Sequence, residues 1–564
     1  MTTGLALDSP AAVAEGATLA ALLRCTVREV AGPRGHVWHA GPYVLLRVAG
    51  DLLRARTRGG LALRFEGLPE RLEDGCWRPL SADDLVRLVE GELGGGNEEF
   101  APQVRASREA MAALLRARRE TAAPADPWLA SEQALVFGHP FHPSPKARGG
   151  RGSGTGNGAG NGAGNGRRGV GDDGEGDAAD WLGYAPEAHA RFPLRLLGVR
   201  RDLLTEQGDT AALDGLGAAP PGYAPLPVHP WQFDLLAPEL AAPLADGRLL
   251  DLGYGSRPAV PTSSVRTVYE PSIDRCLKFS LDVRITNCVR KNSWYELAGA
   301  VELTSRLDPV FRRLAAEFPG TRWLPEPGYR SADLGVRLME GLGVIIRVSP
   351  WSVCRPGVTP LLSGALAAGG HPGADVLPAA AAAAAADPVR WWRAYVERVA
   401  PPVLDAYLNH GVVLEPHLQN VLVGVDDAGM PVEAVFRDLE GTKLVAGRHD
   451  VSELPGRVAD RLTYDAASGW NRVLYCLMVN HLPEVAATLA GTVPETDALL
   501  RELWAVAGEV LAGYAASRGW PRELSELLAG VPLPAKANLS VRWARSADHA
   551  AGYVPVANPL AMLS

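Results

Sequence analysis

A glycine-rich run from Gly149 to Asp177 interrupts this chain of 564 residues. Fourteen of its 29 residues are glycine and none is aromatic. Such a run cannot bury enough apolar surface to offset the conformational entropy lost on ordering, so it predicts a flexible surface loop. No Gly-Lys-Ser/Thr follows it and no apolar strand leads into it, which argues against a phosphate-binding loop.

The chain is too long for one hydrophobic core, because domains usually contain about 100–200 residues, and we expect two to four packed units. Its composition, 47% hydrophobic and 21% charged, is typical of a globular enzyme and excludes a mainly disordered chain. The net charge of −8 comes without a basic stripe, so we expect no nucleic-acid partner.

The sequence also bears on location. It has no run of about 18 uninterrupted apolar residues, and its first residues (MTTGLALDSP) lack the basic and apolar segments of a signal peptide. The six cysteines are scattered without a CxxC pair, which is typical of reduced thiols and indicates neither a disulfide framework nor a zinc ribbon. We therefore expect a cytoplasmic protein with no membrane partner.

The strongest local signal is an apolar strand–turn–strand pattern with polar residues at its base. The strands are predicted at Asn420–Val425 and Val432–Asp438. A hairpin of this length brings Asn420 and Asp438 to the same end, where an amide and a carboxylate suit Mg²⁺ that carries nucleotide phosphates. Protein kinases place an asparagine and a later aspartate in the same relation. The pattern also fits a structural hairpin base in which these residues cap turns.

A second hairpin is predicted from Ser264–Glu270 and Arg275–Leu281, around a Pro-Ser-Ile-Asp turn. Its hydroxyls and cations are Ser263, Ser264, Arg266, Thr267 and Lys278. Arginine offers a fork and lysine a point charge, so this mixture favours an anionic substrate over an exposed strand with solvated charges. A helix is predicted from about Asn287 to Arg306, and Thr286 and Arg290 share a face if the helix begins there.

Two His-Pro pairs, at His139 and His142, lie in the segment GHPFHPSPKARGG, which also contains Lys146 and Arg148. Each proline restricts the residue before it to extended conformations, which predicts a rigid loop. A loop that holds a histidine and two cations over an anion is favoured over a zinc site, because no third ligand is nearby. A further pair at His229 is interpreted as structural.

Other catalytic signatures are missing from the sequence. It contains no G-x-S-x-G elbow, no Walker or GxGxxG motif and no cysteine in a recognisable activated context. Its carboxylates do not form a recognisable glycosidase pair. The two hairpins and the His-Pro loop therefore carry the functional hypothesis.

Taken together, these motifs resemble those of the NRPS-independent siderophore (NIS) synthetases of the aerobactin-synthetase (IucA/IucC) type. The matching segments follow the family's order from about residue 138 to 543 and include GHPFHPSPKARGG, PVHPWQ, SSVRTV, KFSLDVRITNCVR, EPHLQNVLV and FRDLEG. The form HPxHPxxKxR resembles the citrate-using (type A-like) branch. The glycine-rich insertion after Arg148 departs from the family pattern, and we expect it to have no role in the reaction.

The resemblance implies an α+β multidomain fold with a cupped-hand architecture of thumb, fingers and a distantly kinase-like palm. The mainly helical thumb is expected at 1–128. The strand-rich fingers are expected at 129–355 with a disordered insertion at 149–179. The palm, with the Mg/nucleotide hairpin and C-terminal helices, is expected at 356–564. Dimers are common in the family, so a homodimer is one state open to this chain.

The resemblance also implies a two-step reaction in siderophore or metallophore biosynthesis. A carboxylate of citrate, or of a similar polycarboxylate, attacks the α-phosphate of ATP to give an acyl-adenylate and pyrophosphate. An amine or hydroxyl then displaces AMP and leaves an amide or ester. The implied cofactors are ATP and Mg²⁺, and the implied partners are the two small-molecule substrates.

Motif position assigns expected roles to individual residues. The expected ATP contacts are His139, Lys146, Ser264, Arg266, Thr267, Lys278, Gln419 and Asn420. The expected substrate contacts are Thr286, Arg290, His417 and Lys536. Of these, Thr286, Arg290 and His417 are the expected catalytic residues. The expected magnesium ligands are Glu415, Asn420 and Asp438.

Two other classes of protein stay open at this point. A small-molecule kinase-like phosphotransferase releases ADP rather than AMP, but no HxD-type base precedes Asn420 and no glycine-rich loop leads to a strand lysine. A non-catalytic siderophore-binding protein has no need for both a metal–nucleotide hairpin and a separate cationic hairpin.

Overall fold

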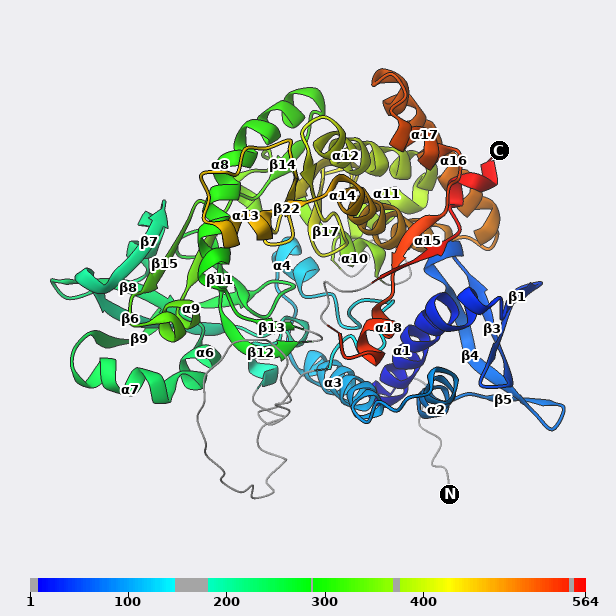
Figure 1. The fold of residues 1–564 in the computed structure, drawn as a ribbon, viewed down its shortest axis with the longest axis horizontal. Helices are drawn as coiled ribbons and strands as arrows, with labels where there is room; N and C mark the ends of the chain where they lie inside the picture. The colour runs from blue at the N-terminus through cyan, green and yellow to red at the C-terminus, as the bar shows by residue number, and fades with distance from the viewer. Residues whose placement is uncertain (1–8, 148–180, 286–287, 369–375, 547–551, 564) are drawn as a thin grey trace.

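The computed structural model describes residues 9–147, 181–285, 288–368, 376–546 and 552–563 (Figure 1). The predicted glycine-rich loop and Thr286 lie outside the described residues. Three sheets organise the rest of the chain: one of five strands, one of eight and one of four. Each has its own cluster of buried apolar side chains. The α+β class is confirmed.

The N-terminal sheet is antiparallel and covered by helices (Figure 1, right). Its strands are β1 (Val37–Ala40), β2 (Tyr43–Val48), β3 (Asp51–Arg58), β4 (Arg64–Glu73) and β5 (Cys76–Pro79). Its helices are α1 (Pro10–Cys25), α2 (Ala82–Leu93) and α3 (Phe100–Glu120). The sequence of this unit is mainly helical in pattern, with short strand-like runs such as Tyr43–Val48; that run is β2, and the other four strands were not predicted. Inward residues alternate along β2, so Val44, Leu46 and Val48 are fully buried.

The central sheet has eight antiparallel strands (Figure 1, left). They are β6 (Phe192–Arg200), β7 (Leu204–Gly208), β8 (Tyr223–Val228), β9 (Leu249–Pro261), β10 (Thr267–Glu270), β11 (Arg275–Phe279), β15 (Gly328–Ala332) and β16 (Val344–Val348). Helices α6 (Pro230–Leu235), α7 (Ala237–Ala245) and α9 (Val336–Gly341) flank it. The predicted second hairpin is confirmed as β10–β11, in which Thr267 pairs with Lys278. We call β10–β11 and the turn before it the central hairpin.

The helix predicted from about Asn287 begins later than expected. Strands β12 (Leu281–Ile285) and β13 (Cys288–Arg290) instead pair antiparallel as a small sheet. Helix α8 runs over Trp294–Glu317, because Ser293 and Glu296 make a capping box at its start. Arg290 therefore lies on a strand, and the prediction that it lies on a helix is wrong.

The C-terminal sheet joins strands from distant parts of the chain in the order β14 (Thr321–Trp323), β20 (Pro431–Phe436), β19 (Val421–Val425) and β17 (Thr359–Leu362). The predicted polar-ended hairpin is confirmed as β19–β20, with Val421 opposite Phe436. We call β19–β20 and the loops at its base the C-terminal hairpin.

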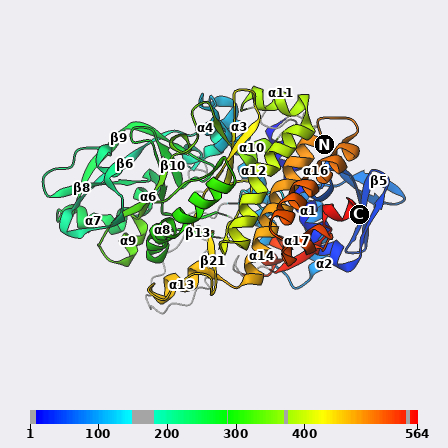
Figure 2. The ribbon, with the colours of Figure 1, turned by 90° about the horizontal axis from the view of Figure 1, so that it is seen from above.

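Helices pack over the C-terminal sheet, and Figure 2 shows α12 and α16 side by side. These helices are α11 (Pro378–Ala386), α12 (Pro388–Leu408), α14 (Ala466–Leu474), α15 (Leu482–Ala490), α16 (Thr496–Ser517) and α17 (Arg522–Leu528). The sequence allows the alanine run at 379–386 as a linker or as a helical extension, and the structure shows it as a helix. The sequence Asp387-Pro388 predicts a helix start, and α12 begins there, because the Asp387 side chain accepts a hydrogen bond from the Arg390 N–H and Pro388 occupies the first turn.

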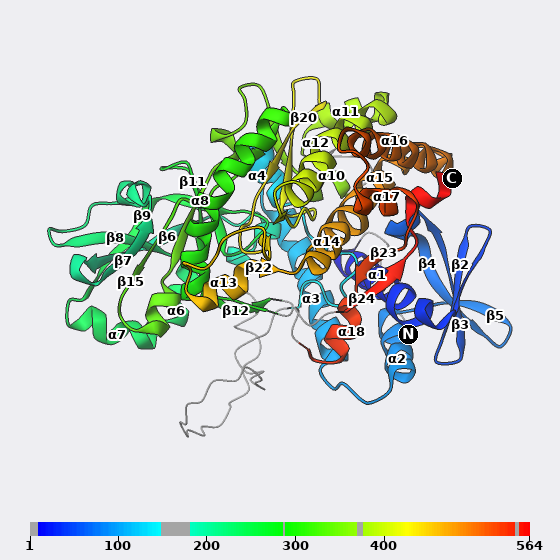
Figure 3. The ribbon, with the colours of Figure 1, turned by 45° about the horizontal axis from the view of Figure 1, so that its top comes forward.

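The last part of the chain returns to the N-terminal unit (Figure 3). The remaining helices are α4 (Pro127–Glu132), α10 (Ser363–Ala367), α13 (Gly456–Leu462) and α18 (Asn538–Trp543). The remaining strands are β18 (Val412–Val413), β21 (Lys443–Val445), β22 (Thr463–Tyr464), β23 (Leu533–Lys536) and β24 (Tyr553–Val556). Leu539 of α18 lies in the N-terminal core, and the Ser540 N–H donates to Glu29 at 2.9 Å. These contacts attach the C-terminal part of the chain to the N-terminal unit.

Two helical stretches, Pro10–Arg34 and Ala466–Ala490, are long and apolar enough to span a membrane by length and composition. All of the apolar window in the second stretch is buried inside the protein, and half of that in the first. Helices that are apolar all round also occur in the cores of large proteins, and Ala466–Ala490 occupies that position here.

Candidate active site

One cavity of about 1210 Å³ lies between the central sheet, the C-terminal sheet and the N-terminal helices. Both hairpins line it. Every predicted site residue that the structure describes also lines it: His139, Lys146, Ser264, Arg266, Thr267, Lys278, Arg290, Glu415, His417, Gln419, Asn420, Asp438 and Lys536. The residues predicted from separate motifs therefore share one cavity.

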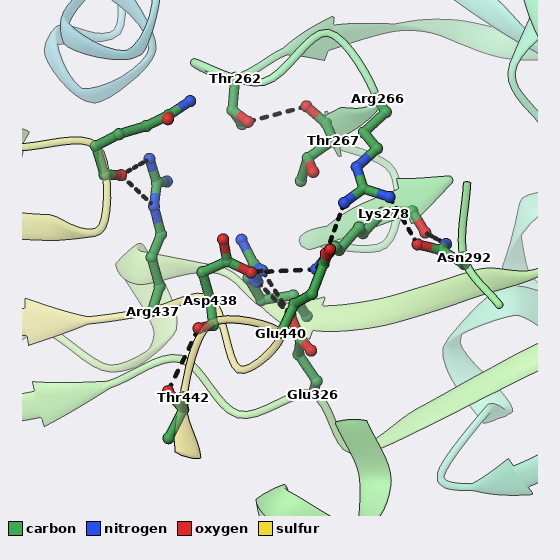
Figure 4. A network of polar contacts seen from close by, with 12 residues as sticks. Thr262, Arg266, Thr267, Lys278, Asn292, Glu326, Arg437, Asp438, Glu440 and Thr442 are labelled. Atoms are coloured by element: carbon green, nitrogen blue, oxygen red, sulfur yellow. Dashed lines mark hydrogen bonds and ion pairs between the residues drawn. The ribbon is translucent and has the colours of Figure 1, made fainter. Parts of the chain in front are cut away.

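The two hairpins touch inside the cavity (Figure 4). The Lys278 ammonium lies 3.1 Å from the Asp438 carboxylate and 2.9 Å from that of Glu440. The Gln419 side-chain amide donates to the Ser263 carbonyl at 2.8 Å. A cationic strand of one sheet is thus held against the carboxylates that follow a strand of the other.

Arg266 makes a second bridge between the hairpins. Its guanidinium donates to the Asn292 amide oxygen at 2.8 Å and to the Glu440 carboxylate at 2.6 Å. The side chain is nearly fully buried, so its fork has a fixed direction (Figure 4). Glu440, the glutamate of FRDLEG, had no role predicted from the sequence, and the structure adds it to the site.

Charge explains how this buried cluster is maintained. Burial by itself raises the pKa of Asp438, but Lys278 and Arg347 outweigh it and hold that pKa well below the usual range. Burial lowers the pKa of Lys278, yet Asp438 and Glu440 more than compensate and raise it. The lysine and both carboxylates are therefore all charged near neutral pH.

The cavity as a whole is cationic. Among the described residues that line it, thirteen are lysine or arginine and seven are aspartate or glutamate. The complete chain has the opposite balance, with a net charge of −8. An excess of cations confined to one cleft attracts anionic ligands.

Arg347 and Glu326 extend the network and were missed from the sequence. The Arg347 Nε donates to a Glu326 carboxylate oxygen at 2.9 Å, and its Nη2 lies 3.5 Å from Asp438. Among the described residues no donor reaches the other Glu326 oxygen, although the side chain is 0% exposed. The arginine within the apolar strand sequence VIIRV could have indicated this network, since a buried strand rarely carries a charge without a partner.

A separate ion pair fixes the base of the C-terminal hairpin. Arg437 donates to the two Glu132 carboxylate oxygens at 2.5 and 2.9 Å, and both side chains are buried. The Arg437 guanidinium also donates to the Gln419 carbonyl at 2.8 Å and to the Ser263 hydroxyl at 3.0 Å. Helix α4 thereby positions the loops of both hairpins.

The cavity histidines share one local geometry. The Nδ1 atom of His139 accepts the Phe141 N–H at 3.0 Å, and that of His417 accepts the Gln419 N–H at 3.3 Å. Burial lowers the pKa of His139 to about 3 and also lowers the pKa of His417, despite the nearby Glu415. A neutral imidazole whose Nδ1 accepts a hydrogen bond carries its proton on Nε2. Both rings therefore offer an N–H donor rather than a base.

The third His-Pro pair, at His229, is structural, as interpreted from the sequence. His229 is fully buried among Tyr184, Phe192 and Phe279, and its Nδ1 accepts the Trp231 N–H at the start of α6. It is not among the described residues that line the cavity.

The predicted magnesium set fits in part. Asn420 and Asp438 lie at the base of the C-terminal hairpin, where the Arg437 N–H donates to the Asn420 carbonyl at 3.1 Å. The buried Asn420 amide nitrogen has no partner among the described residues, so this amide is free to turn toward a ligand. Glu415 is instead paired with Arg472 at 2.5 Å. Within the described residues no cluster of three His, Cys, Asp or Glu side chains forms a complete metal site.

The remaining predicted residues lie along the cavity walls. The Lys146 ammonium forms a buried ion pair with Glu187, and the Arg290 carbonyl accepts a hydrogen bond from the Arg266 guanidinium at 3.2 Å. Lys536 lies on β23 and is mostly buried. All three residues line the same cavity as the hairpin contact.

Comparison with known proteins agrees with this geometry. A model of the IucA/IucC family matches residues 166–368, and a model described as a ferric iron reductase FhuF-like transporter matches residues 389–551. The rhizobactin siderophore biosynthesis protein RhbC of Rhizobium meliloti is 30% identical over 478 residues, which is 77% of this chain and 75% of that protein. The chain belongs to the IucA/IucC family. The family resemblance inferred from the motifs is confirmed.

Other family relatives carry more specific names. The L-2,3-diaminopropanoate–citrate ligase of Staphylococcus aureus is 26% identical, over 67% of this chain and 65% of that protein. The spermidine-citrate ligase of Bacillus anthracis is 27% identical, over 77% of this chain and 73% of that protein. The expectation that the chain is an enzyme of the ligase class is confirmed by these IucA/IucC relatives.

Solved structures of the family have the same fold. ATP-bound aerobactin synthetase IucA of Klebsiella pneumoniae is similar with a TM-score of 0.78 and 23% identity, covering 96% of this chain and 99% of that one. Petrobactin biosynthesis protein AsbB of Bacillus anthracis gives a TM-score of 0.76 with 18% identity, covering 99% and 96%.

Proposed function

We propose that this IucA/IucC enzyme is an ATP-dependent ligase that activates a carboxylate of citrate, or of a similar polycarboxylate, as an acyl-adenylate. An amine or hydroxyl of a second substrate then takes the acyl group, forming an amide or ester of a siderophore or metallophore. The observation that carries this proposal is the meeting of the two hairpins inside one cationic cavity.

The first step joins two anions, and the site has to cancel their repulsion. A carboxylate oxygen attacks the α-phosphorus of ATP, the bond to the β-phosphate breaks, and pyrophosphate leaves. We assign Ser264, Arg266 and Thr267 to the phosphates, together with Lys278. Arg347 is added to this set because it stands beside Asp438. Held in line, the reactants need little further reorganisation.

A magnesium ion, when bound, neutralises phosphate charge. Asp438 and Asn420 are the residues that fit it, since both supply oxygen to the cavity at the base of one hairpin. Glu415 joins them only if Arg472 releases it. His139, Lys146 and Gln419 are assigned to the nucleotide.

The second step replaces AMP by the nucleophile. The amine nitrogen attacks the acyl carbon, the carbon–oxygen bond to AMP breaks, and the amine loses a proton. We assign Thr286, Arg290 and Lys536 to the acid's carboxylates. His417 offers its Nε2–H to the acyl oxygen, because its Nδ1 is occupied by the backbone.

The choice of citrate rests on relatives. Several are named as citrate ligases, with diaminopropanoate or spermidine as the amine. The cavity, at about 1210 Å³, exceeds the 300–1,000 Å³ typical of one ligand and leaves room for nucleotide, acid and amine together. The proposal also includes the thumb, fingers and kinase-like palm at 1–128, 129–355 and 356–564, a cytoplasmic location and a homodimer.

The direct test is carboxylate-dependent pyrophosphate release with citrate, 2-oxoglutarate and succinate, using hydroxylamine to trap the acyl group. We expect AMP, pyrophosphate and a citrate hydroxamate in equal amounts. Release of ADP would indicate a phosphotransferase. Ligand binding without any turnover would indicate a binding protein.

A further inference from the structure

One face of a long helical stretch lines the cavity from end to end. Arg472, Cys476, Asn480 and Glu484 recur every four residues and all border the cavity. Residues 475–481 between α14 and α15 form a π-helical segment. Such segments are rare and frequently occur at functional sites. At about 1.5 Å per residue, this face extends roughly 18 Å from the first of these side chains to the last.

The two ends of this face have different partners. Arg472 pairs with Glu415 near the hairpin contact. Glu484 pairs through one oxygen with Arg64 of the N-terminal sheet at 2.7 Å. The face therefore leads away from the proposed adenylation site toward the N-terminal unit, along a wall that the proposed reaction has not used.

Two acceptors on this wall lack a hydrogen donor. Asn480 is 7% exposed and Glu484 is 4% exposed. No donor among the described residues reaches Asn480 Oδ1 or Glu484 Oε1. A buried acceptor left without a donor costs free energy comparable to a lost hydrogen bond. A ligand that brings an N–H group removes that cost, whereas a carboxylate or phosphate brings further acceptors.

The position of Asn480 relates this wall to the acyl group. The next residue, His481, shares a hydrogen bond of 2.7 Å with the Pro416 carbonyl, and Pro416 directly precedes His417. Asn480 is therefore separated from the proposed acyl-binding histidine by two residue contacts. A nucleophile that reacts beside His417 and continues toward the N-terminal unit passes Asn480 and then Glu484.

The surrounding arginines do not fill this role. Arg64 occupies the other oxygen of Glu484, so it leaves Oε1 open. Arg24 directs its Nε to the carbonyls of Ala62 and Leu63 at 3.1 and 2.9 Å. Arg24, Arg28 and Arg64 all act on the charge of Glu484, yet none of them donates to its second oxygen, which is left for a donor from within the cavity.

We propose that Asn480 and Glu484 bind the amine group of the second substrate that does not react, so that the enzyme prefers diamines and polyamines. The inference rests on the proposed ligase function. The distal ammonium donates to the two oxygens and is unchanged by the reaction, while the other amine attacks the acyl carbon and displaces AMP. The position of Asn480 and Glu484 on the helical face then selects amines by the distance between their two nitrogens.

The test compares two amines that differ only at the distal end, and adds a shorter diamine to vary the distance between the nitrogens. Turnover with citrate and ATP is measured for 1,5-diaminopentane, 1,3-diaminopropane and 1-aminopentane, with hydroxylamine trapping as a measure of adenylation. We expect wild type to prefer a diamine over 1-aminopentane. We expect Asn480→Ala and Glu484→Gln each to raise the KM for that diamine about tenfold. The rate of hydroxylamine trapping, which reports adenylation alone, should change much less.

The Arg64→Gln variant is the matched control. It removes the ion pair with the N-terminal sheet but keeps both acceptor oxygens, so the diamine KM should not rise. If this variant raises the diamine KM as much as Glu484→Gln does, or if 1-aminopentane is weakened equally, the inference is overturned while the ligase proposal stands. If wild type forms no citrate hydroxamate at all, the proposed function fails and takes the inference with it.

Discussion

Lys278 and Asp438 are 160 residues apart in the chain, and their charged atoms lie 3.1 Å apart in the structure. One comes from the central sheet and the other follows the last strand of the C-terminal hairpin. Their contact holds a cation and a carboxylate at the meeting point of two sheets. The proposed chemistry depends on this juxtaposition, since phosphate needs the cation and magnesium needs the carboxylate.

Replacing Lys278 by methionine should lower the rate of citrate-dependent pyrophosphate release by about 100-fold or more. The variant removes a preorganised cation from the proposed phosphate site, an effect of the size seen when one charge-stabilising group is lost. Lys291→Met is the control, because Lys291 pairs with Glu340 at 2.6 Å and does not line the cavity among the described residues. Equal rates in the two variants would contradict the role of Lys278.

Replacing Asn420 by alanine should raise the magnesium concentration needed for half-maximal adenylation by about tenfold. The amide oxygen is a ligand type that Mg²⁺ accepts, and Asn420 stands at the base of the hairpin that carries Asp438. The measurement is a magnesium titration at fixed ATP, with chelation by EDTA as the zero point. Asn409→Ala is the control, since that amide bonds Asp405 instead. An unchanged titration curve for Asn420→Ala would remove Asn420 from the metal site.

Replacing Glu132 by alanine should lower the free energy of unfolding by about 3–5 kcal/mol, because it leaves Arg437 buried without its partner. The matched surface variant is Glu509→Ala, which breaks an exposed pair with Arg393 and should change stability by less than about 1 kcal/mol. Urea unfolding measures both. Similar losses in the two variants would show that the buried pair does not fix the hairpin base.

Stability should fall as the pH drops below about 6.5. Burial lowers the pKa of His139 and His229 to about 3 and that of His481 to about 4, so only the unfolded chain takes up these protons. Each histidine then destabilises the fold by up to about 1.4 kcal/mol per pH unit. Burial raises the pKa of Glu29 to about 7, so the folded chain takes up one proton there as the pH falls. This proton offsets the loss of stability caused by one histidine.

The matching variant for this pH dependence is His229→Asn, whose side-chain oxygen can still accept the Trp231 N–H. Urea unfolding at several pH values between 7 and 5 should give a slope smaller by about 1.4 kcal/mol per pH unit than in wild type. An unchanged slope would mean that His229 takes up a proton in the folded state.

Both hairpins could be predicted because their information is local. Apolar strands of matched length, a turn between them and polar residues at the base suffice to place Asn420 near Asp438. The helix start near Asn287 was predicted too early, because the capping box of Ser293 and Glu296 overrides helical text before it. The strands of the N-terminal sheet were mostly missed, since their pattern is interrupted by charged residues on an exposed face.

The partners of the site were harder to predict than its motifs. Glu326 and Arg347 join the network only because β15–β16 pair with β11, which is a contact between distant segments. Glu132 reaches Arg437 over 305 residues. No local pattern determines such pairs, although a charge within an apolar strand signals that a partner exists.

The most direct measurement uses citrate labelled with ¹⁸O in its carboxylates. If a carboxylate oxygen attacks the α-phosphorus and the amine later breaks the carbon–oxygen bond, one labelled oxygen ends in AMP. The account predicts AMP heavier by one ¹⁸O for each amide formed, with unlabelled pyrophosphate. Label in pyrophosphate or inorganic phosphate, or AMP without label, would contradict it.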